Sequence, residues 1–213
     1  MATTTDRSAE PDVRPRSLRA LERAEHACER CDLHRMARVV PGVGPRDARI
    51  MVIGEQPGDR EDLEGVPFVG PAGRLLDDLL EDAGLERDEL FLTNAVKRFR
   101  HHVKELAGGG VKRIHDKPTV RQQKACHGWI ESELEIIDPR VLVLLGSTAV
   151  QSVLGTKTRL RDVQHQVVER EGLPPIIATS HPSAALRAPT SADRAAIRDD
   201  IRDALARARD LAR

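Results

Sequence analysis

The sequence predicts an α/β protein with three layers, in which a mostly parallel sheet of four strands lies between two layers of helices. Short apolar runs bounded by Gly, Pro or polar residues alternate with longer segments of helical period. This alternation is typical of parallel sheets whose strands are joined by crossover helices. Aromatic residues make up only 2% of the chain, which argues against an aromatic-rich β-sandwich.

The first elements follow from local patterns. Residues 1–16 are rich in Thr, Pro and charge and have no apolar period, so we expect a disordered arm followed by one domain over 17–213. Ser17 is suited to cap a helix over 17–31, because apolar residues after it recur at helical spacing. Residues 49–54 are an apolar run between turn residues, which is typical of a buried parallel strand.

The later elements continue the alternation. Pro71 suits a first helical turn and Gly84 suits a helix end, so a helix is expected between them after a Gly/Pro-rich loop. The remaining predictions are a strand over 89–94, a basic loop over 97–118, a helix over 119–138, a strand over 141–146, a helix over 147–155, a polar hairpin-like stretch, a strand over 175–180 and a closing helix over 192–212.

The charge is balanced overall but not locally. The chain has 34 basic and 34 acidic residues, so its net charge does not indicate a polyanionic partner. Between Lys97 and Lys124, however, nine Lys or Arg residues stand against two acidic ones. Such a stretch suits contact with a nucleic-acid backbone, although a solvated loop and helix face is the commoner explanation. The chain has no apolar run of membrane-spanning length, and its polar start lacks the apolar core of a signal peptide, so we expect a cytoplasmic protein without membrane contact.

Polar residues follow three of the predicted strands directly. Glu55 comes after 49–54, Asn94 ends 89–94, and His181 comes after 175–180. Ligands of parallel α/β sheets bind outside the carboxyl ends of the strands. The sequence therefore predicts that these three side chains meet at one edge of the sheet.

Four motifs stand in a fixed order on these elements: GEQPGDREDLEGVPFVGPAGRLL, TNAVK, KRIH and SHPS. With them, residues 25–190 resemble iron–sulfur uracil-DNA glycosylases of family four, and more closely the UdgX-type proteins, which have an inserted loop ending in KRIH. The resemblance implies the uracil-DNA glycosylase fold and a DNA repair enzyme that flips uracil out of DNA, single-stranded DNA above all, and cleaves its glycosidic bond.

The resemblance also implies roles for site residues. Glu55 is expected to stabilise the sugar cation, and His181 to hold the charge that grows on uracil O2. The expected substrate-binding residues are Gln56 in the uracil pocket, Phe68 as the stacking ring, Asn94 as the reader of the base edge, Arg113 in the KRIH loop, and Ser183 and Arg187 near phosphates. Taken singly, a turn-forming acid, a loop-anchoring Phe and a turn-forming Asn are ordinary alternatives.

His115 separates the two related groups. Family-four enzymes have a shorter loop there and use water, whereas the UdgX-type proteins place this histidine at the sugar. A neutral imidazole is a competent nucleophile toward a cation, and an N-alkylated imidazole has no good leaving group. The resemblance therefore implies a covalent adduct between His115 and the abasic sugar.

Three cysteines complete the pattern, and they are Cys28, Cys31 and Cys126. Three is an odd number of cysteines, and in a chain expected to be cytoplasmic this argues against a disulfide framework. A CxxC pair alone would more often indicate zinc or redox chemistry. The resemblance implies instead that the three bind a 4Fe-4S cluster. Arg98 stands where the family has its fourth ligand, and arginine stays protonated, so His102 or its neighbour His101 is expected to substitute, with His34 or an open iron position as alternatives.

Two other functions remain open from the sequence. One is a uracil-DNA glycosylase that turns over because water replaces His115. The other is a non-catalytic iron–sulfur protein that binds DNA, against which the presence of Glu55, Asn94 and His181 argues. We expect a monomer in each case.

Overall fold

The computed structural model of the chain describes residues 15–213. Its centre is a five-stranded sheet in the order β2-β1-β5-β7-β6. The strands β1 (Ile50–Gly54), β2 (Leu90–Asn94), β5 (Val141–Leu145) and β7 (Ile176–Thr179) are parallel, and the two-residue strand β6 (Val167–Val168) pairs antiparallel with β7. The predicted fold class is confirmed, with β6 as an additional edge strand. The predicted arm lies almost wholly outside the described residues.

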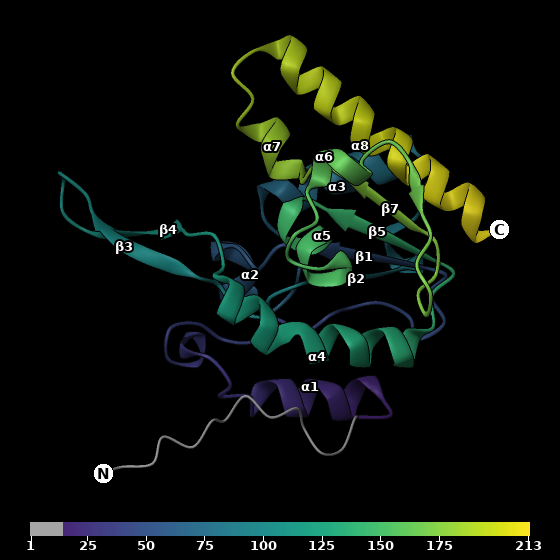
Figure 1. Cartoon of the computed structure of the whole chain (residues 1–213). Helices are drawn as coiled ribbons and strands as arrows, with labels where there is room; N and C mark the ends of the chain where they lie inside the picture. The colour runs from purple at the N-terminus through teal and green to yellow at the C-terminus, as the bar shows by residue number, and fades with distance from the viewer. Residues whose placement is uncertain (1–14) are drawn as a thin grey trace.

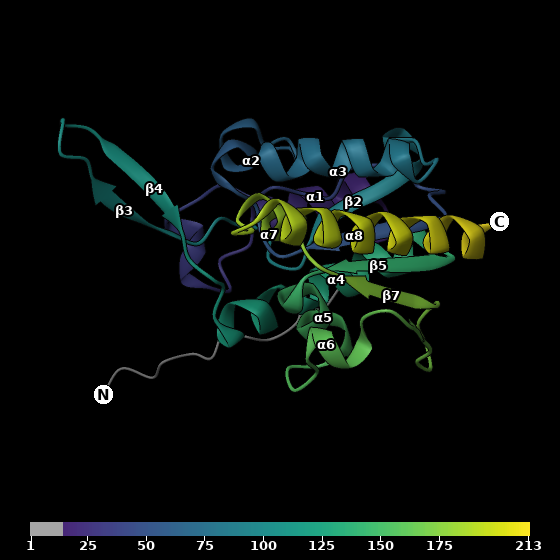
Figure 2. The ribbon, with the colours of Figure 1, turned by 90° about the horizontal axis from the view of Figure 1, so that it is seen from above.

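Helices cover both faces of the sheet (Figures 1 and 2). One face packs against α3 (Pro71–Asp82) and α8 (Ser191–Ala212), and the other against α4 (Val120–Ile137) and α5 (Ser147–Leu154). Every residue of β1, β2 and β5 is buried, because both faces of these strands are covered. The helix α1 (Leu18–His26) lies outside α4 and packs on it through Leu21, Trp129 and Ile136.

The predicted basic loop contains regular structure. Strands β3 (His101–Glu105) and β4 (Val111–His115) pair into an antiparallel hairpin that projects from the body in both views (Figures 1 and 2). Most of its residues are exposed on both faces, so the hairpin lacks the apolar alternation by which strands are recognised in a sequence. The shorter elements are α2 (Asp59–Glu64) within the Gly/Pro loop, α6 (Leu160–Val163), α7 (Pro182–Leu186) and the 3₁₀ turns Asp32–Arg35 and Arg87–Glu89.

The first helix is shorter than predicted. It ends at His26 with Ala27 as its C-cap residue, so Cys28 and Cys31 lie in the segment that follows the helix. Ser17 caps its start as expected, since the Ser17 hydroxyl accepts a hydrogen bond from the backbone N–H of Ala20. Within residues 15–213, no helix has both the length and the apolar character needed to cross a membrane.

Candidate active site

A cavity of about 610 Å³ opens at the carboxyl ends of the parallel strands. Side chains from segments far apart in the sequence meet there. Glu55, Asn94 and His181 are among them, at one edge of the sheet as predicted. The predicted site residues that line the cavity are Glu55, Gln56, Phe68, Asn94, His115, His181, Ser183 and Arg187. Arg113 does not line it.

Glu55 lies at the end of β1 with both carboxylate oxygens engaged. Its Oε1 lies 3.2 Å from His115 Nε2, and its Oε2 accepts a hydrogen bond of 2.5 Å from the Thr148 hydroxyl. Burial raises the pKa of the Glu55 carboxyl, but the hydrogen bonds from His115 and Thr148 outweigh burial and hold the pKa below its ordinary value. Glu55 is therefore ionised at neutral pH and presents a fixed negative charge to the cavity.

His115 is the last residue of β4, and its side chain is 49% exposed. The base of its hairpin is fastened by Gln56, whose amide nitrogen donates to the carbonyls of Arg100 and Asp116 at 3.1 Å each. The Gln56 amide oxygen accepts the backbone N–H of Arg100 at 3.0 Å. Gln56 thus binds both legs of the hairpin, and its amide is not free to read a base. Gln56 also lines the cavity, and its expected place in the uracil pocket stays a prediction.

Arg113 also differs from the expectation. Its guanidinium binds the carboxylates of Asp59, at 2.6 Å, and of Asp62, both on α2. It also lies 5.5 Å above the ring of Phe99, whose other neighbours are the rings of His101 and His115. Three of the five N–H groups of Arg113 donate to α2, so Arg113 ties the hairpin to this helix.

Phe68 reaches the cavity from a strained loop. It has a left-handed backbone with φ of 57°, and its N–H donates to Glu61 Oε1 at 2.8 Å, which holds this conformation. The ring is 2% exposed and nearly parallel to that of His181, with centroids 6.2 Å apart. A side chain at Gly73 would collide with the Phe68 carbonyl, and one at Gly54 would collide with the Phe68 ring, so both glycines are required where they stand.

Asn94 ends β2 beside Glu55 and is 2% exposed. Its amide nitrogen has no hydrogen-bond partner within the described part of the chain, although the side chain lines the cavity. Buried polar groups are normally paired. The Asn94 amide nitrogen is therefore available as a donor at the wall of the cavity.

His181 follows β7 and begins α7. Burial lowers the pKa of its imidazole to about 4, so the ring is neutral at physiological pH. Its Nδ1 accepts the backbone N–H of Ser183 at 3.2 Å and lies 2.8 Å from the Ser183 hydroxyl. Since Nδ1 is an acceptor, the proton of the neutral ring is on Nε2. Ser183 therefore orients His181 instead of being free for a phosphate, whereas Arg187 is exposed at the rim.

The three cysteines gather beside one apolar cluster. Cys28 and Cys31 pack against a buried apolar cluster that contains Cys126, between α1 and α4. Burial raises the pKa of the Cys31 thiol and raises that of Cys126 to about 12. A thiolate at Cys126 therefore needs a strong positive partner, and a metal cluster supplies one. The three thiols in an apolar wall suit three ligand positions of an iron–sulfur cluster.

The expected fourth ligand does not fit as well. His102 Nδ1 lies 3.0 Å from both carboxylate oxygens of Asp116, and His101 stacks on Phe99 with centroids 4.8 Å apart, so the hairpin base holds both rings. His34 lies beside Cys31, with Nδ1 2.6 Å from the Cys31 carbonyl oxygen. Its Nε2 accepts a hydrogen bond of 3.3 Å from the Arg35 guanidinium, so the His34 ring is held by its neighbours as well, and the identity of the fourth ligand stays a prediction.

The Arg98 side chain lies next to Cys28. Its guanidinium donates to the carbonyls of Ala37, at 2.7 Å, and Cys28, at 3.1 Å. Over residues 15–213, no three His, Cys, Asp or Glu side chains are arranged to hold a single metal ion. A cluster is wider than one ion, and its ligands bind different iron atoms, so this finding bears on mononuclear sites.

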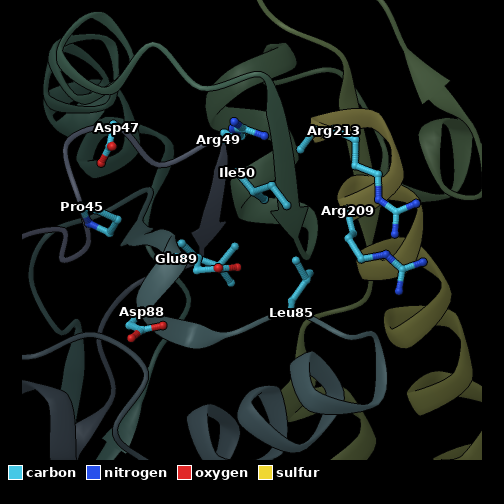
Figure 3. Close-up of a pocket in the computed structure, with 11 residues that line it drawn as sticks. Pro45, Asp47, Arg49, Ile50, Leu85, Asp88, Glu89, Arg209 and Arg213 are labelled. Atoms are coloured by element: carbon cyan, nitrogen blue, oxygen red, sulfur yellow. The ribbon is translucent and has the colours of Figure 1, made fainter.

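A second cavity, of about 530 Å³, lies at the amino ends of β1 and β2 (Figure 3). Its charged residues are three arginines, Arg49, Arg209 and Arg213, and three acids, Asp47, Asp88 and Glu89. The figure shows them on its rim around the apolar side chains of Ile50 and Leu85. It contains no His, Cys, Ser or Thr, so the groups that support nucleophilic chemistry are at the other edge of the sheet.

Sequence reasoning missed the residues that support the site. Thr148, Phe99, Glu61 and the pair Asp59 and Asp62 each contact a predicted site residue. Thr148 is 93 positions from Glu55. No local pattern signals such a contact, whereas the acidic run after GEQPG was visible and suits partners for the arginine of KRIH.

Comparisons with known proteins show the family of this chain. A family model described as the uracil DNA glycosylase superfamily matches residues 41–205. The chain is 35% identical over 179 residues to a type-4 uracil-DNA glycosylase of Thermotoga maritima, covering 83% of this chain and 87% of the relative. It is 34% identical over 181 residues to a type-4 uracil-DNA glycosylase of Archaeoglobus fulgidus, covering 81% and 85%. A type-5 uracil-DNA glycosylase of Thermus thermophilus matches at 36% over 121 residues, covering 56% and 55%.

Proposed function

The chain belongs to the uracil-DNA glycosylase superfamily, and we propose that it excises uracil from DNA and remains covalently joined to the deoxyribose through His115. One observation carries the covalent part of this proposal. His115 Nε2 lies 3.2 Å from Glu55 Oε1 inside the cavity that also holds Asn94 and His181. The nucleophile and the carboxylate that would meet the sugar cation are thus already in contact.

The excision step uses four side chains of the cavity. The flipped uracil stacks on Phe68 and presents an acceptor to the unpaired Asn94 amide nitrogen. As the bond from N1 to C1′ breaks, its electrons go to the uracil ring and positive charge grows on the sugar. The His181 Nε2–H donates to the oxyanion of the base, and the Glu55 carboxylate stabilises the cation.

The trapping step follows from the contact between His115 and Glu55. In the tautomer of His115 that carries its proton on Nδ1, the Nε2 lone pair forms a bond to C1′, and the imidazolium that results loses its Nδ1 proton to water. The departing uracil anion takes a proton from water, so the net reaction joins the protein to the abasic sugar and releases uracil. Because a neutral N-alkyl imidazole is a poor leaving group, the bond persists.

A second candidate is a glycosylase that turns over, and the comparisons favour it. The relatives that match most of this chain are named type-4 uracil-DNA glycosylases. In this alternative water attacks C1′, with Glu55 as its base, and His115 only lines the cavity. The two candidates differ in the fate of the sugar and share the excision step.

The cysteines would hold the cofactor in either case. We propose that Cys28, Cys31 and Cys126 bind a 4Fe-4S cluster. Such a cluster would cross-link the end of α1 to α4 and take no part in the reaction, since glycosidic cleavage requires no electron transfer.

The deciding experiment mixes the protein with a labelled single-stranded oligonucleotide that contains one uracil, followed by a denaturing gel. Wild type is expected to give a slow-migrating covalent band. His115→Ser is expected to lose the band and to leave an alkali-labile abasic product, because water enters the vacated space. His102→Ser is the matched control, since it removes an imidazole that also contacts a carboxylate on this hairpin but lies outside the cavity.

Each other outcome contradicts part of the proposal. A covalent band that survives His115→Ser shows that another residue is the nucleophile. An alkali-labile product without any band in wild type establishes the alternative that turns over. An unchanged oligonucleotide in wild type contradicts both.

A further inference from the structure

The β3–β4 hairpin has two faces, and only one of them contacts the body of the protein. Residues directly opposite each other in an antiparallel pair share a face. Arg113 and His115, opposite Val103 and His101, lie on the face that reaches α2 and Glu55. The other face carries His102 opposite Ile114 and, one pair farther out, Lys104 opposite Lys112. We call the side chains of Lys104 and Lys112 the lysine pair.

The lysine pair is unfavourable for the hairpin itself. Like charges directly opposite on neighbouring strands are destabilising. Both side chains are exposed, and neither forms an ion pair within residues 15–213. Glu105, the acid within these two strands, lies on the other face, opposite Val111. The two ammonium groups therefore have no anionic partner within residues 15–213 and are available to an anion from outside the molecule.

The lysine pair is continuous with the cavity. Ile114 and Lys117 line the cavity, and Lys112 is two residues before Ile114 on the same face of the strand. Two residues of a strand cover about 6.6 to 6.8 Å. That rise is comparable to the spacing of successive phosphates in an extended single strand, so a strand leaving the cavity along this face would place a phosphate at the lysine pair.

We propose that the lysine pair binds the phosphodiester backbone of the DNA strand immediately outside the cavity, beside the flipped uracil. The inference rests on the proposed function in that the strand enters this cavity. A phosphate between Lys104 and Lys112 removes their repulsion and fixes the direction in which the strand leaves the site. The hairpin thereby acts as a binding arm as well as the support of His115.

The first test of this proposal measures DNA binding in the absence of uracil excision. The lysine variant carries both Lys104→Gln and Lys112→Gln. Fluorescence anisotropy at increasing salt measures the affinity of wild type and of the lysine variant for a single-stranded oligonucleotide without uracil. The slope of log K against log salt should fall by about 0.7 for one lost phosphate contact. The control Arg207→Gln, Arg213→Gln removes two charges at the carboxyl end of α8, which lies at the other end of the molecule in Figure 1, and should leave the slope unchanged.

A second measurement locates the contact. With a uracil oligonucleotide, the lysine variant should react more slowly at limiting protein and equally fast at saturating protein, since Lys104 and Lys112 do not line the cavity. Removing nucleotides one at a time from one side of the uracil should abolish the difference between variant and wild type, whereas removing them from the other side should preserve it.

Other results overturn the inference. An unchanged salt slope in the lysine variant, or an equal loss in the control, shows that the pair binds no phosphate. Preferential binding of the pair to an acidic peptide with no change toward DNA would assign the face to a protein partner. The binding measurement with the oligonucleotide without uracil requires no excision. Its result can therefore be interpreted even if the protein proves not to excise uracil. Thermal unfolding should show the lysine variant at least as stable as wild type, because a repulsion is removed.

Discussion

Replacing Thr148 by Val tests how the active-site carboxylate is set. Thr148 is fully buried at the start of α5, and its hydroxyl donates to Glu55 Oε2 at 2.5 Å, while Glu55 Oε1 faces His115. Valine keeps the shape of the side chain and removes only this hydrogen bond. A hydrogen bond to a charged group contributes about 1.5–3 kcal/mol. If that contribution is felt in full when the sugar cation forms, excision slows by about 10-fold to about 140-fold.

The pH dependence distinguishes positioning from general damage. The Thr148 bond stabilises the anionic form of Glu55, so its loss raises the pKa of that carboxyl. The acid limb of the single-turnover rate of uracil excision should therefore move to higher pH in Thr148→Val. Rates are measured by quenching the reaction and cleaving the abasic product with alkali.

Two controls lie on the same helix. Thr148→Ser keeps the hydroxyl and should restore the wild-type acid limb. Ser152→Ala removes a buried hydroxyl that has no hydrogen-bond partner within the described residues and should change neither rate nor profile. If Thr148→Val excised uracil at the wild-type rate with an unmoved acid limb, the assignment of Thr148 as the residue that positions Glu55 would be wrong.

Further outcomes are expected at three other residues. Asn94→Asp replaces the unpaired amide donor by a carboxylate, and leaving a uracil acceptor unpaired costs about 1–3 kcal/mol, so excision should fall while non-specific DNA binding is kept; an unchanged excision rate contradicts the assigned contact. Cys126→Ser should lower the iron content of protein purified without oxygen, and equal iron in variant and wild type argues against this ligand. Burial raises the pKa of Glu25 to about 8 from 4.5, so the folded state binds the extra proton between these values and the free energy of unfolding falls as pH rises across them; Glu25→Gln should flatten this dependence in urea unfolding, and parallel curves would refute it.

The sheet and the convergence of its strand ends could be predicted from local sequence. Strands such as 141–145 are continuous apolar runs, and Glu55, Asn94 and His181 each follow one of them directly. Parallel strands bring residues at their carboxyl ends together, whatever the crossover connections are. The hairpin could not be predicted in this way, because its exposed strands need no apolar face and its glycine-rich turn is typical of a loop.

The detailed roles of residues were harder to predict, because they depend on partners distant in sequence. Gln56 makes its hydrogen bonds to residues 44 and 60 positions away. The His102 side chain meets Asp116 across the hairpin register, which was unknown while 97–118 was expected to be a loop. Residue type gives no sign of these contacts, which tie Gln56 and His102 to the hairpin.

One short segment explains how the half-exposed His115 is held beside Glu55. Residues 55–62 supply Glu55, which contacts His115, and Gln56, which fastens both legs of the hairpin. The same segment supplies Asp59 and Asp62, which bind Arg113 two residues before His115. The carboxylate and the groups that hold His115 in place thus belong to one short piece of chain at the end of β1. Because Glu55 and the three side chains that fasten the hairpin all lie within residues 55–62, the fold of a single segment sets the distance between the carboxylate and His115.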